Sequence, residues 1–493
     1  MARSPNSSAE ARCRDDGPVV GLVALGGIVV RLGIYVGLSQ AGWFYGVPWD
    51  TFSRTYLAWQ WAQRPYFAAG DMYWLPLQFW LVGAAYVLLR PLTSNASDLL
   101  VPVAVNNLFT AGSLALTALT AAELGGLLAA VLACLLAATF AQDVWVSYSG
   151  LAEPIYIFFI LLAGRLVLRH WYSPAFPVSL GVVGLGAGAT HYIGWFLAAF
   201  CAIAIGIRMA LYPQARQGRG LALSLGGLLL CGLFPTLWLA ANWRVWGDPF
   251  HPLKVAAVYQ APYAGRLGLE ERLVALARTA LEVIGLLAPV GAAGVLRVLT
   301  RRPGAVRYLL PGFWVLGLVW LASAAGLAAP FQEPRYLTFV GWLLIPFAGA
   351  LLGGLWARGR TGRVAAAILA GGLLATGLYQ TFHFSNSFGP DLAEVGRRAG
   401  VFLRENPSSR VAVEVASLEP LADYGERGVL PVVAGFPDRF DFVVGKTPEA
   451  AEVLLGRAWS GDLVITANLA TARLASASGL RVEAVGRYFL VKP

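Results

Sequence analysis

The sequence has few charged residues, few cysteines and almost no lysine, and each shortage excludes a class of protein. Asp, Glu, Lys and Arg make up only 13% of the 493 residues, about half of their share in a soluble globular chain. Four cysteines without a C-x-x-C spacing exclude a disulfide scaffold, and the sequence has no H-E-x-x-H zinc motif. What remains is apolar: hydrophobic residues reach 57% and the mean hydropathy is +0.63. This composition indicates an integral membrane protein.

The formal net charge of +10 comes almost entirely from arginine, because lysine occurs only at Lys254, Lys446 and Lys492. The arginines lie mainly in short connectors between apolar segments. Basic residues in such connectors set the orientation of membrane helices, whereas a nucleic-acid site needs them gathered on one face. We therefore interpret the arginines as topology signals and expect no nucleic-acid partner.

Eleven apolar segments are long enough to form membrane helices. The first, residues 18–40, follows a polar tail at 1–17 and is too long for the core of a signal peptide. The others cover about residues 99–121, 124–141, 153–169, 175–190, 191–208, 220–244, 273–299, 309–329, 336–356 and 363–383. A cytoplasmic N-terminus places the arginine-rich connectors on the cytoplasmic side, as the positive-inside rule requires. We predict a multi-pass protein of the plasma (inner) membrane with its N-terminus in the cytoplasm.

Two segments on the predicted outer side differ from the rest. Residues 41–98 are rich in Trp, Tyr and Pro; because Trp and Tyr favour the membrane interface, we expect a long loop with short helices there. Residues 388–493 read as an extracytoplasmic α/β domain, which we interpret as a cap or docking module because it lacks cysteine and a glycine-rich phosphate loop. Its expected helices are 391–405, 448–459 and 469–477, and its expected strands are 410–415, 440–444 and 462–466.

Ionisable residues at membrane depth are costly and are functional candidates for that reason. Asp50 directly follows the first predicted helix, where it is either functional or the N-cap of a short helix at 51–63. Glu153 opens the helix at 153–169 beside Pro154, which is an ordinary helix start, but it lies on the same predicted side as Asp50. Two carboxylates at one cleft can hold a metal, bind an amine or hydroxyl, or act as general base and support.

Basic residues on the same side extend the candidate site. Arg335, at the start of the helix at 336–356, either binds phosphate or snorkels to the interface. Lys254 is a second candidate phosphate contact, although an exposed lysine usually contributes little. His191 is more often a packed interface residue than a catalytic one. The remaining candidates are Arg54, Asp248 and Glu333.

Two motifs in this region resemble a known family. W-D-T-F-S-R-T-Y-L-A at 49–58 and Y-W-L-P-L-Q-F-W at 73–80 resemble the first extracytoplasmic loop of the GT-C glycosyltransferases, in the branch of the protein O-mannosyltransferases and aminoarabinose transferases. A-E-P at 152–154 is similar to the second acidic position of the family, and Arg335 to its phosphate-contacting basic residue. The resemblance spans residues 18–383 in layout. It implies a GT-C-like fold of about eleven membrane helices, a juxtamembrane helix within 73–89 and a catalytic transmembrane domain at 18–387.

The resemblance implies a transferase that moves a hexose or pentose from a polyprenyl-phosphate donor to a glycan, lipid or protein acceptor at the outer face. Asp50 then acts as general base or orients the acceptor, Glu153 positions a substrate, and Arg335 with Lys254 stabilises charge on the leaving phosphate. Tyr73 and Trp74 line the donor site. Several members have an acidic pair where this chain has one carboxylate, so no cofactor is certain. A divalent metal, if one binds, is expected at Asp50 and Glu153.

A transporter or lipid flippase that uses the same carboxylates is the alternative from another class. Two observations weigh against it: the ionisable residues gather on one face rather than at mid-membrane, and the sequence shows no inverted repeat. A third interpretation is a non-catalytic assembly partner, which a cleft without Asp50 and Glu153 would favour.

Overall fold

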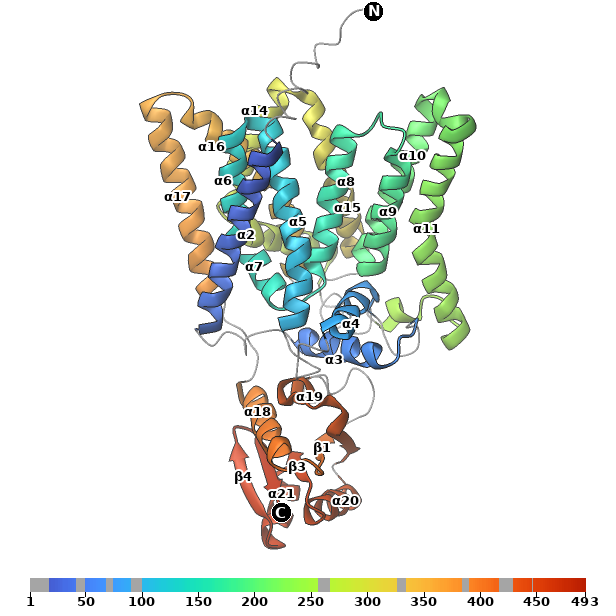
Figure 1. Ribbon diagram of the computed structural model, residues 1–493, viewed down its shortest axis with the longest axis vertical. Helices are drawn as coiled ribbons and strands as arrows, with labels where there is room; N and C mark the ends of the chain where they lie inside the picture. Colours follow the sequence, from blue (N-terminus) through green and yellow to red (C-terminus); the bar gives the residue numbers. More distant parts are fainter. Residues whose placement is uncertain are drawn as a thin grey trace, which may run out of the picture.

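The computed structural model describes residues 17–40, 49–67, 74–89, 100–255, 267–325, 334–383, 390–415, 429–445 and 447–493. A bundle of membrane helices carries two short helices at one end, followed by a small α/β domain (Figure 1). We call this end of the bundle the domain side. The predicted fold class, a polytopic helical membrane protein with a C-terminal α/β domain, is confirmed.

Helices of the bundle coincide with all eleven predicted spans. Nine of these spans are single helices. Two of the nine, α8 (Glu153–Arg169) and α9 (Phe176–Thr190), have 17 and 15 residues. Within the described residues seven helices are long and apolar enough to cross a membrane: α2 (Gly17–Gln40), α5 (Leu100–Gly125), α10 (Tyr192–Leu211), α11 (Gly218–Trp246), α15 (Val306–Ala324), α16 (Thr338–Trp356) and α17 (Arg360–His383).

The other two predicted spans are broken, which corrects the expectation of continuous helices. The span predicted at 124–141 is replaced by α6 (Leu127–Ala138) and α7 (Ala141–Tyr148), which meet at 56°. Residues 273–299 form α13 (Leu269–Ile284) and α14 (Leu287–Arg301), which meet at 88° at Gly285, where φ is 50°. Glycine adopts this conformation without a steric penalty. A hydropathy window measures apolar length and does not detect such a bend.

The arginine-rich connectors lie at the end of the bundle opposite the domain side, where α8, α10, α14 and α16 end (Figure 1). Glu123, near the end of α5, lies there too and pairs with Arg165 at 2.5 Å and with Arg169 at 3.1 Å. The connector between α5 and α6 contains no basic residue, so the charge of Glu123 is balanced by two arginines of α8.

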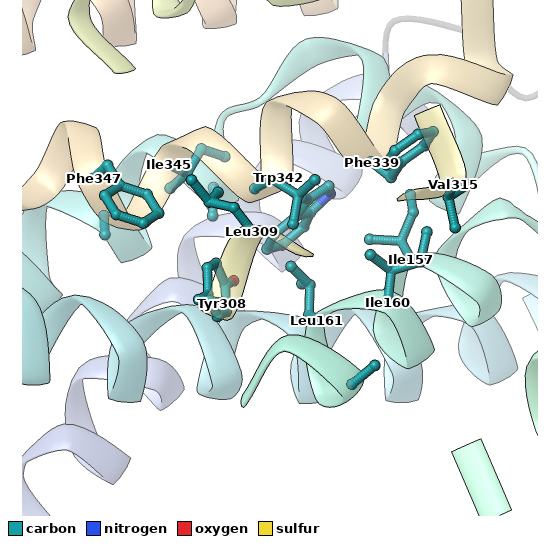
Figure 2. Packing of buried hydrophobic residues seen from close by; sticks show 14 of the residues in the cluster. Ile157, Ile160, Leu161, Tyr308, Leu309, Val315, Phe339, Trp342, Ile345 and Phe347 are labelled. Atoms are coloured by element: carbon teal, nitrogen blue, oxygen red, sulfur yellow. The ribbon is translucent and has the colours of Figure 1, made fainter. Parts of the chain in front are cut away.

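The central core of the bundle is packed between α8, α15 and α16 (Figure 2). Small residues let these helices approach closely: a Cβ atom on Gly164 of α8 would lie 2.6 Å from the carbonyl oxygen of Tyr308 on α15. Such contacts are typical of membrane helices. This packing fixes the domain-side ends of α8 and α16. The large side chains here are Ile157, Ile160, Leu161, Tyr308, Leu309, Val315, Phe339, Trp342, Ile345 and Phe347.

The α/β domain contains a five-stranded sheet in the order β2-β1-β3-β5-β4. Its three predicted strands are present and parallel, and its three predicted helices are present within one residue of the expected bounds. Two further features were not predicted: α19 (Leu430–Ala434) and the antiparallel hairpin of β4 (Arg481–Val485) and β5 (Tyr488–Lys492). The predicted elements are α18 (Pro390–Glu405), β1 (Val411–Val415), β2 (Phe440–Val444), α20 (Pro448–Trp459), β3 (Leu463–Thr466) and α21 (Leu469–Ala477).

The two short helices of the domain side are α3 (Trp49–Gln63) and α4 (Leu77–Leu89). The α/β domain packs against them through α19, which contacts α3 (Figure 1). One apolar cluster includes Phe52 of α3 together with Leu430 and Val432 of α19. The helix that contacts the α/β domain is therefore the helix that carries Asp50.

Candidate functional site

Three of the predicted site residues meet at the domain side, where the guanidinium of Arg335 lies between two carboxylates. Nη2 of Arg335 is 2.6 Å from Oδ2 of Asp50, and Nε is 3.2 Å from Oε1 of Glu153. Asp50 lies on α3, Glu153 on α8, and Arg335 on the 3-10 turn η5 (Pro334–Leu337) before α16. Asp50 and Arg335 are 285 positions apart in the chain. We call these three residues the carboxylate–arginine cluster.

The members of the cluster differ in their exposure. Arg335 and Glu153 are buried, with 5% and 3% of their surface exposed, whereas 29% of the Asp50 side chain is exposed. Buried charges need partners because desolvation is expensive, and the two ion pairs supply them. Oδ1 of Asp50 accepts no hydrogen bond from any residue that the structure describes. Asp50 is therefore the carboxylate that a substrate can reach.

Glu153 is positioned by the turn that precedes it. Three consecutive carbonyl oxygens of this turn each accept a hydrogen bond from a side chain of a different helix, so the turn is tied to α3, α4 and α5 at once. At Gly150 the backbone has a φ of 69°, in the left-handed region that favours glycine. The three hydrogen bonds run from Thr51 to Ser149, from Gln78 to Gly150 at 2.8 Å, and from Asn106 to Leu151 at 2.5 Å.

Arg335 is positioned by the backbone of η5 and by an aromatic ring. Its carbonyl oxygen accepts a hydrogen bond from Oγ1 of Thr338 at 2.7 Å, and the Tyr156 hydroxyl donates to the carbonyl oxygen of Tyr336 at 3.0 Å. Its guanidinium also lies over the Tyr336 ring, 5.2 Å from the centroid. These contacts from α8 and α16 hold the guanidinium in place.

A second buried guanidinium belongs to Arg54, one turn after Asp50 on α3. Arg54 is 5% exposed, and its Nε and Nη1 atoms are buried without a hydrogen-bond partner among the described residues. The guanidinium stacks on Trp74, with Cζ 4.5 Å from the ring centroid. A buried guanidinium with unused donors is costly until an anion binds to it. Arg54 is thus a candidate anion contact beside the cluster.

His191 lies in the connector between α9 and α10 and packs between two tyrosines. Its ring centroid is 5.5 Å from that of Tyr156 and 5.1 Å from that of Tyr336. Nδ1 accepts the backbone N–H of Ile193 at 3.1 Å and so caps α10. Burial, followed by the positive charges of Arg54 and Arg335, lowers the pKa of His191 to about 3. The imidazole is therefore neutral at pH 7 and carries its proton on Nε2.

The structure does not bring every predicted residue to the cluster. Lys254 pairs with Asp248 at 2.6 Å, and 70% of its side chain is exposed; within the described ranges no contact joins this pair to Arg335. The hydrogen bond from Lys254 lowers the pKa of Asp248. Tyr73 and Glu333 lie outside the described residues.

A buried ion pair between Arg31 of α2 and Asp143 of α7 was not predicted from the sequence. Arg31 also donates to the carbonyl oxygen of Ala138 at 3.0 Å, so it ties α2 to both sides of the bend between α6 and α7. A signal was available, because Arg31 is the single charged residue in the apolar run 18–40. Asp143 gave no such signal, because it lies between the predicted spans 124–141 and 153–169.

No protein-family model matches this sequence, and no curated protein is similar to it. Solved structures are similar in fold. ArnT from Cupriavidus metallidurans bound to undecaprenyl phosphate matches over 93% of this chain and 97% of its own, with a TM-score of 0.57 and 12% identity. The Archaeoglobus fulgidus oligosaccharyltransferase complex with Zn and sulfate matches over 90% of this chain and 67% of its own, with a TM-score of 0.50 and 14% identity. Both are GT-C glycosyltransferases, so this chain has the GT-C fold that the sequence predicts.

Proposed function

We propose that this multi-pass membrane protein is a glycosyltransferase that moves a sugar from a polyprenyl-phosphate donor to an acceptor. The carboxylate–arginine cluster carries this proposal. It places an exposed carboxylate, Asp50, beside the buried guanidinium of Arg335 at the domain side of a helix bundle with the GT-C fold. A polyprenyl donor keeps its tail in hydrocarbon and presents its anionic head at the interface. The fold neighbour ArnT, bound to undecaprenyl phosphate, supports this class of donor.

The domain side is, in this proposal, the extracytoplasmic face of the plasma membrane. The arginine-rich connectors at the opposite end of the bundle support this orientation, because positive residues favour the cytoplasmic side. The N-terminus then lies in the cytoplasm, and the α/β domain lies outside, next to the acceptor.

Asp50 is proposed as the general base of the transfer. The acceptor hydroxyl oxygen attacks the anomeric carbon of the sugar, and its proton passes to the free Oδ1 of Asp50. The bond between the anomeric carbon and the phosphate oxygen breaks, and its electron pair leaves with the phosphate. The products are the glycosylated acceptor and free polyprenyl phosphate. Glu153 acts through Arg335, whose guanidinium orients Asp50.

Arg54 is proposed as the first contact of the donor phosphate. The family resemblance implies this role for Arg335 with Lys254, but Arg335 already pairs with two carboxylates, and Lys254 is exposed and paired with Asp248. Arg54 is buried and has unused donors. Stacked on Trp74, it can stabilise the negative charge that develops on the leaving phosphate.

One fold neighbour was crystallised with zinc, which raises the question of a metal at the cluster. The residues of this chain do not fit one. The guanidinium of Arg335 lies between the two carboxylates, and in the part of the chain that the structure describes no group of three His, Cys, Asp or Glu residues is placed to hold a metal ion. The proposed reaction therefore uses no metal in any step.

The test is release of free polyprenyl phosphate. Purified protein is mixed with a panel of polyprenyl-phosphate hexoses and pentoses and with a membrane extract as acceptor. We expect release with at least one donor, and the productive donor identifies the sugar. No release with any donor, from protein that is monodisperse and folded, contradicts the proposal and makes flux assays for a transporter the next measurement.

A further inference from the structure

Arg335 serves two carboxylates through two different nitrogens. Its Nη2 atom contacts Asp50 and its Nε atom contacts Glu153. The planar fork of a guanidinium suits such pairing from two edges, which the single ammonium of a lysine cannot reproduce. Arg335 thus links α3 to α8 through a hydrogen-bonded ion pair with Asp50 and an ion pair with Glu153.

This position is the one at which a divalent cation neutralises paired carboxylates in a metal site. Here the two carboxylates carry two formal negative charges and Arg335 carries one positive charge. Glu153 is almost fully buried, and a buried carboxylate without a positively charged partner is costly to the fold. The structure supplies that cation from its own chain.

The guanidinium of Arg335 is buried and held in place, whereas the guanidinium of a surface arginine exchanges partners. Arg335 is 5% exposed, its carbonyl oxygen is held by Thr338, and its guanidinium lies over the Tyr336 ring. A metal ion entering this place has to displace a buried and anchored side chain.

We propose that Arg335 is a positioning residue that takes the place of a divalent metal in this site. It holds Asp50 oriented toward the acceptor and pairs with the buried carboxylate of Glu153, so the site assembles without an added cation. The expected effect of Arg335 on the rate of transfer rests on the proposed function. The expected effect on metal binding depends only on the geometry of the cluster.

The experiment removes the guanidinium and measures whether a metal replaces it. Arg335→Ala leaves the two carboxylates unopposed, and we expect this variant to bind about one Mn²⁺ per chain, a typical divalent probe of carboxylate sites. Wild type is expected to bind none. The double variant Arg335→Ala with Glu153→Gln should lose the gained site. Binding is measured on purified full-length protein by electron paramagnetic resonance of Mn²⁺ and by the Mn²⁺-dependent rise in melting temperature.

Transfer activity provides a second readout that a merely structural role would not move. Chelator-treated wild type should keep its full rate of polyprenyl phosphate release. Arg335→Ala should lose release, and millimolar guanidinium ion should restore part of it by filling the vacated place. Arg335→Lys keeps the positive charge, so it should gain no Mn²⁺ site. It lacks the planar guanidinium that contacts both carboxylates, so its kcat should be lower. If Arg335→Ala does not fold, Arg335→Gln removes the charge with a side chain of similar length.

Two results would overturn the inference. Stoichiometric Mn²⁺ binding by wild type, or loss of its release activity after chelation, shows that the site uses a metal beside Arg335. Folded Arg335→Ala and Arg335→Gln variants that gain no Mn²⁺ show that the carboxylates do not need a cation there. The failure of the proposed function looks different: wild type then releases no polyprenyl phosphate from any donor, while the Mn²⁺ comparison still decides the role of Arg335.

Discussion

Asp50→Asn tests the proposed general base with little disturbance of the fold. The amide oxygen of asparagine can still accept the hydrogen bond from Nη2 of Arg335, and Arg335 keeps its ion pair with Glu153. Because 29% of the Asp50 side chain is exposed, solvent screens the lost charge, and the free energy of unfolding should fall by about 1 kcal/mol or less.

The expected effect on the rate is much larger than the effect on stability. A positioned general base contributes roughly 100-fold to 10,000-fold, which corresponds to about 3–5 kcal/mol of transition-state stabilisation. The amide of the variant cannot take the proton of the acceptor hydroxyl, so kcat should fall by this factor. The melting temperature should stay within a few degrees of that of wild type.

The assay is release of polyprenyl phosphate, with thermal unfolding of the same preparations. Asp248→Asn is the matched control, because it makes the same chemical change at a carboxylate that pairs with the exposed Lys254 outside the cluster. Its rate should match wild type. A folded Asp50→Asn variant that turns over at the wild-type rate refutes the general-base role, and equal losses in both variants refute the assignment of the loss to the cluster.

Three further predictions concern the supports of the site and the α/β domain. Asn106→Leu leaves a buried carbonyl of the turn before α8 unpaired, so thermal unfolding should show a loss of about 1–3 kcal/mol and release should slow. Gly181→Ala places a Cβ atom 2.6 Å from a backbone oxygen of α11 and should lower the melting temperature, whereas Gly226→Ala, with nothing within 4 Å, should not. The hydrogen bond from Arg410 holds the pKa of Asp441 below its ordinary 3.8; this pair therefore stabilises the domain above that pH and loses its effect as the pH falls through the lower folded pKa. The melting difference between wild type and Asp441→Asn should stay constant above about pH 5 and shrink as the pH falls from there to below 3.8.

Much of the architecture follows from local properties of the sequence. Within the described residues, helices lie at each of the eleven apolar segments that the sequence predicts, and the arginine-rich connectors fall at one end of the bundle. Asp50, Glu153 and Arg335 stand out because ionisable residues are rare beside apolar helices. The predictions fail at the bend at Gly285, which leaves no mark on hydropathy, and at the β4–β5 hairpin, which was not predicted.

Only the tertiary structure decides which charges become partners. The sequence presents Arg335 as a phosphate contact, but helix packing brings it between Asp50 and Glu153, whereas Arg54 is buried on Trp74 with its Nε and Nη1 unused by any described residue. It likewise joins Arg31 to Asp143, which local patterns leave unconnected. Hydrophobic length and interfacial composition are properties of neighbouring residues, so the sequence alone determines the helices and the side on which candidates lie. The pairing of buried charges depends on contacts between helices hundreds of residues apart, and desolvation makes that pairing obligatory only once the helices are packed.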